Sequence, residues 1–202
     1  MFDALMRRVI DPPLNRVGAE LARAGMSANT LTATGFAIGI CAVPALAAGL
    51  TGVALLCITF NRILDGLDGP VARHRGATDL GGYLDIVADF IFYSAVPFGL
   101  ALADPQANAL PAAFLIFSFV ASGSTFLAFA AVAAKRGIMT QAQGKKSLYY
   151  LGGLMEGTET ILFLLFIAAF PMWFAQAAWI FGALCWISAA GRVAIAVQSF
   201  RR

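Results

Sequence analysis

Six long apolar segments make up most of the chain, and they restrict it to one kind of fold. They cover residues 28–50, 52–73, 80–103, 108–135, 147–170 and 172–199. A helix of about 20 apolar residues crosses the hydrocarbon core of a bilayer. Because backbone amides in lipid must pair within their own segment, segments of this length cross as helices. We therefore predict an all-α integral membrane protein with six transmembrane helices.

The composition agrees with a bilayer as the solvent. Hydrophobic residues make up 60% of the 202 residues and charged residues only 12%, whereas soluble domains carry about 25% charged residues. The six segments leave no stretch long enough for a sizeable soluble domain, and nothing in the chain predicts a nucleic-acid partner.

Positive charges fall on one side of this predicted topology. If both termini are cytoplasmic, the outer loops are about 49–52, 104–108 and 170–172, and none of them contains Lys or Arg. The inner side carries Arg7, Arg8, Arg16, Arg23, Arg73, Arg75, Lys135, Arg136, Lys145, Lys146, Arg201 and Arg202, while Arg62 and Arg192 lie within predicted helices. Because cytoplasmic loops carry the excess of Lys and Arg, we predict a multi-pass protein of the cell's inner membrane with both termini in the cytoplasm.

The residues before the first span form a separate unit. Apolar residues recur at helical spacing from Phe2 to Ile10, with Arg7, Arg8 and Asp11 between or after them. This pattern predicts a basic amphipathic helix lying on the inner leaflet; the alternative is a solvated N-terminal arm. We therefore divide the chain into a juxtamembrane helix, 1–24, and a six-helix membrane domain, 25–202.

Acidic residues are concentrated where the second and third spans meet. Five of the eleven in the chain are Asp65, Asp68, Asp79, Asp85 and Asp89. The spacing of Asp65 from Asp68, and of Asp85 from Asp89, puts each pair on one helix face. Four converging carboxylates repel one another, and a hard divalent cation (Mg²⁺, Mn²⁺ or Ca²⁺, but not zinc) relieves the repulsion. The alternative is a cluster solvated by headgroups and paired with Arg62, Arg73 and Arg75.

Small residues and one arginine accompany the carboxylates. Gly69, Gly76, Gly81 and Gly82 allow a bulky ligand to approach the backbone closely, and Arg73 offers a bidentate fork for phosphate. Together with a metal ion, these features predict a site for a pyrophosphate or nucleotide. The sequence contains no GxxxxGK[ST] loop, so it is not a P-loop site.

The motif as a whole resembles the signature of the CDP-alcohol phosphotransferase family. It reads Asp65-x-x-Asp68-Gly69-x-x-Ala72-Arg73, followed by Gly81-x-x-x-Asp85-x-x-x-Asp89. The segment 27–32, Ser-Ala-Asn-Thr-Leu-Thr, is also similar to the family's sequence before its first span. Seven residues separate Arg73 from Gly81, where the family pattern often has eight, and the difference falls in the turn between helices.

The resemblance implies a reaction and a set of roles. A CDP-linked lipid, typically CDP-diacylglycerol, donates its phosphatidyl group to an alcohol and CMP leaves. The resemblance implies that Asp65, Asp68, Asp85 and Asp89 hold two divalent cations, Mg²⁺ or Mn²⁺, and that Asp89 is the catalytic base. The residues implied for the cytidine diphosphate are Asn29, Thr32, Asp65, Asp68, Gly69, Ala72, Arg73, Thr78 and Gly81. Two alternatives stay open: a CDP-linked amino alcohol that reacts with diacylglycerol, and a cation carrier that is not an enzyme.

The acceptor alcohol is predicted from polar residues in the last two spans. Glu156, Glu159 and Arg192 are costly in lipid, and we interpret them as an acceptor pocket; the alternative is a buried structural ion pair. Family members with phosphorylated acceptors tend to line this pocket with Lys and Arg, which are absent from 126–134. We therefore expect a small alcohol without a phosphate, such as inositol or serine, with glycerol 3-phosphate as the alternative. Small residues such as Gly35, Gly39, Ser122 and Gly123 predict close helix packing and a homodimer.

Overall fold

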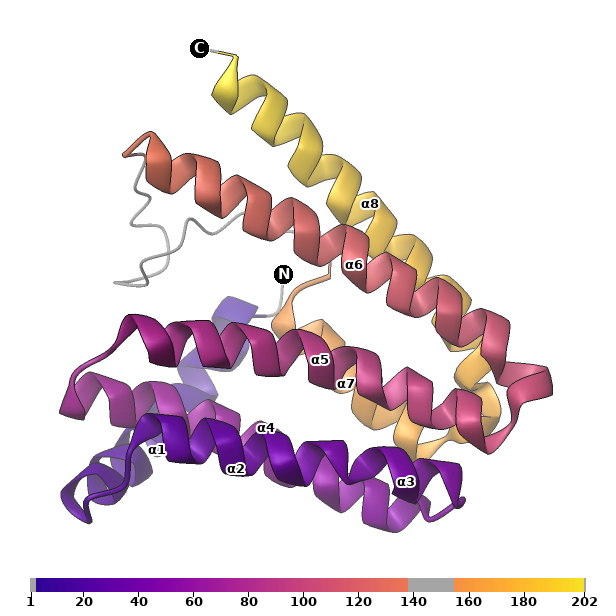
Figure 1. Cartoon of the computed structure of the whole chain (residues 1–202), viewed down its shortest axis with the longest axis horizontal. Coiled ribbons are helices and arrows are strands. Elements are labelled where there is room, and N and C mark those ends of the chain that lie inside the picture. Colours follow the sequence, from indigo (N-terminus) through magenta and orange to yellow (C-terminus); the bar gives the residue numbers. More distant parts are fainter. Residues whose placement is uncertain (1–2, 138–154, 202) are drawn as a thin grey trace.

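The computed structural model of the protein describes residues 3–137 and 155–201. These residues form a bundle of helices (Figure 1). In chain order they are α1 (Asp3–Arg23), α2 (Ala28–Ile40), α3 (Ala42–Ala47), α4 (Thr51–Arg75), α5 (Asp79–Ala103), α6 (Pro105–Lys135), α7 (Gly157–Ala169), the 3₁₀ turn η1 (Pro171–Trp173) and α8 (Phe174–Phe200).

Polar residues fix several helix starts. Ser27 accepts a hydrogen bond from Thr30 N at 3.1 Å, and Thr78 accepts one from Gly81 N at 3.0 Å. Asp104 does the same for α6, whose first residue is a proline. Gly76 ends α4 with a φ of +101°, which only glycine adopts readily. The chain therefore reverses between α4 and α5 over three residues, 76–78.

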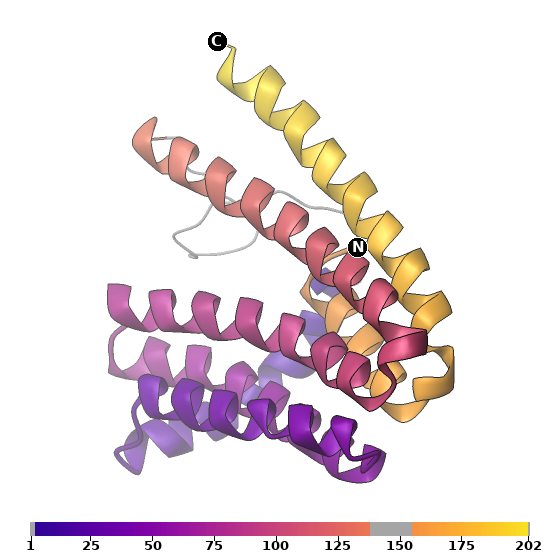
Figure 2. The same cartoon turned by 45° about the vertical axis from the view of Figure 1, so that its right-hand side comes forward.

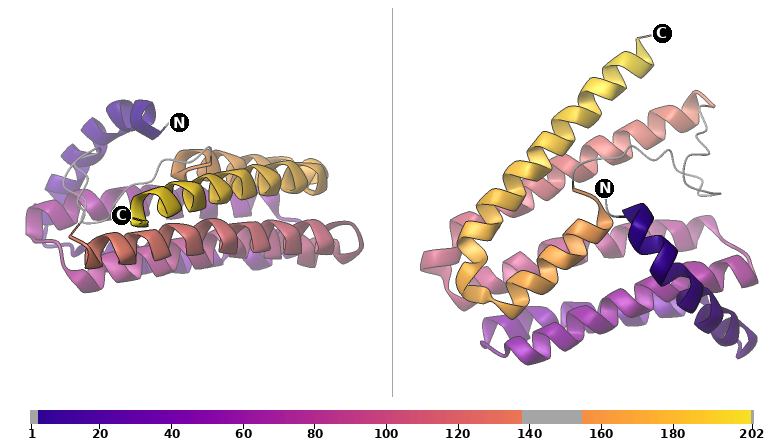
Figure 3. Two further views of the ribbon diagram at one scale, coloured as in Figure 1. Left: turned by 90° about the horizontal axis from the view of Figure 1, so that it is seen from above. Right: turned by 180° about the vertical axis from the view of Figure 1, so that it is seen from behind.

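The helices form two groups. The α2–α3 pair, α4 and α5 run side by side, and α6 pairs with α8 at an angle to them (Figures 1 and 2). α7 packs mainly on α4, and the view from behind shows α1 crossing the end of the bundle next to α4 (Figure 3). One apolar core, with Phe92, Leu115, Leu164 and Phe174 fully buried, joins the two groups.

Four of the six predicted spans are confirmed by length and composition among the described residues. They are Ala28–Ala47, Asp79–Ala103, Pro105–Lys135 and Pro171–Phe200. α4 is long enough but carries too many charges to count as apolar, and α7 is apolar but has only 13 residues. The beginning of the predicted span 147–170 lies outside the described residues. Membrane crossing by α4 and α7 therefore stays a prediction.

The predicted first span, 28–50, is present as one apolar stretch but is divided into two helices. α2 ends at Ile40, a turn follows at Cys41, and α3 then covers six residues. The physical reason is Pro44, which has no N–H to donate to the carbonyl of Ile40 and so cannot continue the helical hydrogen bonds. The two pieces still form one apolar stretch.

The two ends of the bundle differ in charge. The turns before α4, α6 and α8 lie at one end, on the right of Figure 1. The opposite end carries basic residues at the ends of α4, α6 and α8, namely Arg73, Arg75, Lys135, Arg136 and Arg201. Lys145, Lys146 and Arg202 lie outside the described residues. This separation is the one expected from the sequence, and which end faces the cytoplasm stays a prediction.

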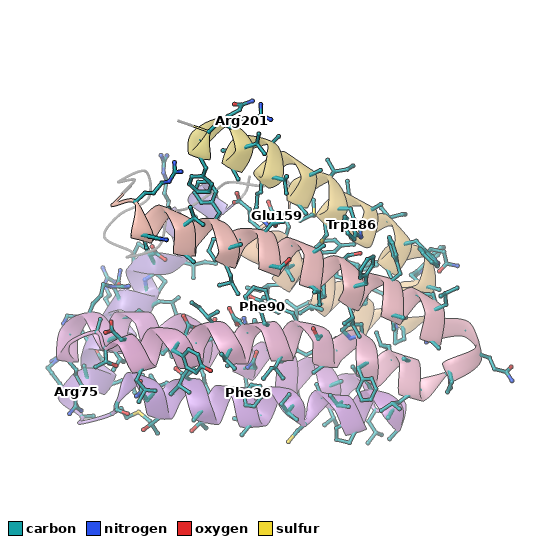
Figure 4. All side chains as sticks on the ribbon, turned by 45° about the horizontal axis from the view of Figure 1, so that its top comes forward. Phe36, Arg75, Phe90, Glu159, Trp186 and Arg201 are labelled. Atoms are coloured by element: carbon teal, nitrogen blue, oxygen red, sulfur yellow. The ribbon has the colours of Figure 1, made fainter. Side chains whose placement is uncertain are left out.

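Glycines allow the helices to approach one another closely, as predicted. A Cβ atom on Gly123 would lie 2.2 Å from the Phe90 ring, which Figure 4 shows between α5 and α6. A Cβ on Gly39 would meet Asn61 and Phe92 at 2.8 Å, and one on Gly35 would meet Leu64 at 3.0 Å. These glycines therefore pack inside the chain, and the predicted homodimer remains untested.

The N-terminal segment forms α1, which packs on α4. Gly18 is buried, and a Cβ there would lie 2.3 Å from the Cβ of Pro70. One turn earlier, Leu14 packs near Gly66. α1 is thus attached to the bundle, while its position at the membrane surface stays a prediction.

We predict that Gly18→Ala destabilises the protein. The added methyl group must push α1 away from Pro70, and overpacking of this kind costs about 1–3 kcal/mol. Thermal unfolding in detergent measures the effect. Gly191→Ala in α8 is the matched control, because a Cβ there meets no atom within 4 Å. Equal unfolding temperatures for the two variants would contradict the close α1–α4 packing.

Candidate active site

A cavity of about 590 Å³ lies where helices of both groups meet. Its walls come from α1, α4, α5, α6, α8 and the start of α7. Acidic side chains from α4 and α5 line one part of it, and phenylalanines from α5 and α6 line another. The cavity therefore offers charged and apolar surface side by side, as a ligand with a polar head and an apolar tail requires.

Three of the four predicted carboxylates form a compact group in this cavity. Asp65, Asp68 and Asp85 each place a carboxylate oxygen within 4.8 Å of the others. Asp68 is 7% exposed and accepts a 2.5 Å hydrogen bond from the hydroxyl of Thr32. Oxygen ligands at this spacing suit Mg²⁺ or Mn²⁺, and Thr32 orients one of them from outside the group. These residues fit a divalent cation.

Asp89 lines the same cavity but is not a member of this group. Its Oδ1 contacts Arg62 Nη1 at 2.8 Å, and its Oδ2 accepts a hydrogen bond from the Tyr93 hydroxyl at 3.2 Å. The same Nη1 lies 3.4 Å from Asp65 Oδ2. Arg62 therefore bridges Asp89 and the three-carboxylate group.

Arg62 is held on every side by its neighbours. Its side chain is 8% exposed, and its Nε donates to Asn61 Oδ1 at 2.7 Å. The guanidinium carbon lies 4.6 Å from the ring centre of Phe92 and 5.3 Å from that of Tyr93. Aromatic faces and carboxylates together stabilise a cation that has little access to water.

Arg73 lies at the exposed side of the cavity, where α1 meets α4. Its Nη2 donates to Asn15 Oδ1 at 2.6 Å, so α1 helps to orient it. Gly69 lies one turn before Arg73 and leaves its backbone accessible in the cavity wall. Asp11 of α1 lines the same region. A guanidinium beside open backbone is suited to a phosphate group.

The predicted site residues divide into two sets among the described part of the chain. The cavity wall includes Asp65, Asp68, Gly69, Arg73, Asp85, Asp89, Glu156 and Arg192, and it does not include Asn29, Thr32, Ala72, Thr78, Gly81 or Glu159. Several of the residues outside the wall support the residues that form it. Thr32 bonds Asp68, Thr78 caps α5, and Gly81 leaves room for the side chain of Asn29, whose oxygen would lie 3.0 Å from an added Cβ.

The sequence placed Glu156 inside the predicted span 147–170, and this was wrong for its position in the helix. Glu156 has an extended backbone and is the N-cap of α7, with Glu159 at the third position of the helix. The two form a capping box, in which Glu159 Oε2 accepts from Glu156 N at 3.2 Å. Glu159 therefore has a structural role, while Glu156 also lines the cavity.

Arg192 reaches the cavity from α8. Its side chain is 7% exposed, and Nη1 donates to the hydroxyl of Ser122 at 2.8 Å and to the Ser122 carbonyl at 3.1 Å. These bonds join α8 to α6 across the wall. Thr158 and Thr160 of α7 line the same region, so a hydrogen-bonding ligand finds several partners there.

The sequence named Arg62 only in the alternative interpretation, as an ion-pair partner of the acidic cluster, and this pairing is present. Tyr93 and Asp11 were not assigned to the site. Arg62 had a usable signal, because an arginine within a predicted span, three residues before Asp65, shares that residue's helix face. Tyr93 follows Asp89 by one turn, which is a weaker signal. Asp11 reaches the cavity only because α1 packs on α4.

The fold and the carboxylate group define an all-helical protein with apolar spans and a candidate divalent-cation site. Residues 26–194 match the CDP-alcohol phosphatidyltransferase family, and the chain belongs to that family. It is 52% identical over 193 residues to inner membrane protein YnjF of Escherichia coli K12, covering 96% of this chain and 94% of that protein. It is also 34% identical over 98 residues to archaetidylinositol phosphate synthase of Pyrococcus horikoshii, covering 48% of this chain and 52% of that protein.

The fold is also similar to crystal structures of phosphatidylinositol phosphate synthase (PgsA1) from Mycobacterium tuberculosis. The structure with CDP-DAG bound has a TM-score of 0.65 at 20% identity, covering 91% of this chain and 93% of that one. The complex with manganese and citrate has a TM-score of 0.70 at 22% identity, covering 91% of this chain and 88% of that one.

We predict that Thr32→Val weakens binding of a divalent cation by about 10- to 100-fold, the usual effect of losing a residue that orients a metal ligand. The change removes the hydrogen bond to Asp68 but keeps the shape of the side chain. Titration of purified protein with Mn²⁺, followed by electron paramagnetic resonance, measures the affinity. Thr34→Val is the matched control, because Thr34 is exposed on the same helix. Equal Mn²⁺ affinity in both variants would show that Thr32 does not orient a ligand.

Proposed function

We propose that the protein transfers the phosphatidyl group of CDP-diacylglycerol to a small alcohol and releases CMP. The observation that carries the proposal is the group of Asp65, Asp68 and Asp85, which shares one cavity with Asp89 and Arg73. Family membership supports the reaction type. The CDP-DAG complex of a protein with a similar fold supports the donor.

The donor is bound by the α1–α4 side of the cavity in this proposal. Arg73 pairs with the pyrophosphate, and Gly69 lets the nucleotide approach the α4 backbone. The apolar wall, with Phe90, Phe119 and Phe126, receives the start of the acyl chains. Asn29, Thr32, Ala72, Thr78 and Gly81 lie outside the wall, so we assign them to support of these residues.

Asp65, Asp68 and Asp85 hold a divalent cation, Mg²⁺ or Mn²⁺. When bound, the cation neutralises charge on the pyrophosphate and stabilises the leaving phosphate. The manganese complex of the Mycobacterium tuberculosis protein supports the type of ion. Without the cation, the hydrogen bond from Thr32 still orients Asp68, and the ion pair with Arg62 still orients Asp65.

Asp89 is the base that receives the acceptor's proton. The acceptor oxygen forms a bond to the phosphorus that carries diacylglycerol, the bond from that phosphorus to the CMP oxygen breaks, and Asp89 takes the hydroxyl proton. Arg62 and Tyr93 each occupy one direction on the Asp89 carboxylate, which has about four lone-pair directions. A hydroxyl in the cavity can therefore still reach it.

We assign the acceptor to the α6–α7–α8 side of the cavity. Ser122, Glu156 and Thr158 offer hydrogen bonds there, and the α6 residues in the wall include no Lys or Arg. This favours an alcohol without a phosphate, such as inositol or serine. Arg192 favours a second candidate, a phosphorylated polyol, and the Pyrococcus horikoshii relative is named as a synthase of archaetidylinositol phosphate.

The location follows from the same proposal. A donor with lipid tails and a soluble acceptor meet only at a membrane surface, and the basic end of the bundle suits the cytoplasmic side. The similarity to an inner membrane protein supports a multi-pass protein of that membrane. We propose that both termini and the site face the cytoplasm and that the protein forms a homodimer.

We predict that Asp89→Asn lowers CMP release at least 100-fold, because loss of a general base typically costs 10²- to 10⁴-fold. The assay measures CMP from CDP-diacylglycerol at saturating acceptor. Asp79→Asn is the matched control, since Asp79 is exposed at the start of α5 and outside the cavity wall. Full activity of Asp89→Asn would rule out this residue as the base.

We predict that the protein releases CMP from CDP-diacylglycerol when inositol or serine is the acceptor. The assay tests each donor with each acceptor. CDP-choline with diacylglycerol should be inactive, and activity there would replace the proposed donor by the alternative one. Inositol 1-phosphate and glycerol 3-phosphate complete the panel. If a phosphorylated acceptor is preferred, the second candidate is correct, and Arg192→Gln should then raise its KM more than it lowers kcat. No CMP release from any pair would contradict the proposed function.

A further inference from the structure

Arg62 occupies a place between two of the four aspartates. A single nitrogen, Nη1, lies 2.8 Å from Asp89 Oδ1 and 3.4 Å from Asp65 Oδ2. A bridging cation between these two carboxylates would have to lie at much the same place. The site thus already contains one positive charge that belongs to the chain.

This guanidinium is not a mobile surface group. Its Nε bonds Asn61, which donates its own amide hydrogen to the Gly35 carbonyl at 2.9 Å. Phe92, which is fully buried, covers the guanidinium. Moving Arg62 aside would break these contacts and leave a charge in an apolar core, which is unfavourable.

The remaining carboxylates form a set of their own. Asp65, Asp68 and Asp85 converge within 4.8 Å, whereas Asp89 is not part of that group. If one divalent ion binds these three aspartates, Asp89 remains paired with Arg62. A second divalent ion beside Asp89 would be repelled by a fixed guanidinium at contact distance.

We propose that Arg62 takes the place of a second metal ion, so that the site holds one divalent cation on Asp65, Asp68 and Asp85; that this cation serves phosphatidyl transfer rests on the proposed function. The family resemblance had implied two ions. Arg62 is a positioning residue in this arrangement, because it holds the Asp89 carboxylate against the cavity without touching the reacting atoms.

The charge of Arg62 differs from that of a metal ion in a way that matters for the site. A guanidinium cannot exchange with solvent and cannot be removed by a chelator. Asp89 therefore keeps its position when the divalent cation leaves, and only the three-aspartate group depends on the metal concentration.

The number of bound ions tests the proposal without any substrate. Purified protein in detergent is titrated with Mn²⁺ alone, and bound Mn²⁺ is counted by equilibrium dialysis and by electron paramagnetic resonance. We expect one Mn²⁺ per wild-type chain, with the spectrum of an isolated ion. Arg62→Gln should bind two, with the spin coupling of a close pair. The double variant Arg62→Gln with Asp89→Asn should return to one, because the second ion needs Asp89.

Tyr93→Phe is the matched control, since it removes a hydrogen bond to Asp89 but keeps the guanidinium, and it should still bind one ion. Two Mn²⁺ on the wild-type chain would overturn the proposal, as would a count of one for a folded Arg62→Gln. If Arg62→Gln does not fold, the wild-type count alone decides. A wild-type chain that binds one Mn²⁺ but releases no CMP from any donor and acceptor pair would contradict the proposed function and not this inference.

Discussion

Mutual repulsion among four aspartates on two neighbouring helices is the constraint on which the arrangement of this protein depends. Asp65 and Asp68 on α4 and Asp85 and Asp89 on α5 line one part of the same cavity, where the Asp65 and Asp89 side chains are only about a quarter exposed. Such a cluster persists only if positive charge and hydrogen-bond donors are supplied from nearby. Arg62 supplies a fixed charge to Asp65 and Asp89, and Thr32 supplies a donor to Asp68. The proposed divalent cation would neutralise the charge that remains on the three-aspartate group.

The packing around the cluster serves this electrostatic requirement. Asn61 and Phe92 hold Arg62 in place, and both would collide with a side chain at position 39, so α2 approaches closely only because Gly39 lacks one. On the other side, Gly18 allows α1 to lie against Pro70 and to bring Asn15 to Arg73. The contacts that allow close helix packing are therefore the same contacts that position the charged residues of the site.

Most helices and the carboxylate cluster were predictable, because both depend on local sequence. Apolar length identified the spans, and helical spacing put the aspartates on common faces. The break at Cys41 was missed because a proline inside an apolar stretch can be tolerated in a membrane helix. Glu156 was misplaced because a helix start depends on capping, and Glu159 provides that cap only when the chain turns at this point.

The sequence by itself determined the class of protein, four of the six predicted spans and the aspartates that form the cluster, since hydrophobic length and i, i+3 or i, i+4 spacing act within one segment. Only the tertiary structure decided that Asp89 is bound by Arg62, that α1 forms a wall of the cavity, and that Arg192 meets Ser122. These are contacts between residues up to 70 positions apart. They depend on how whole helices pack, and no periodicity within a segment encodes them.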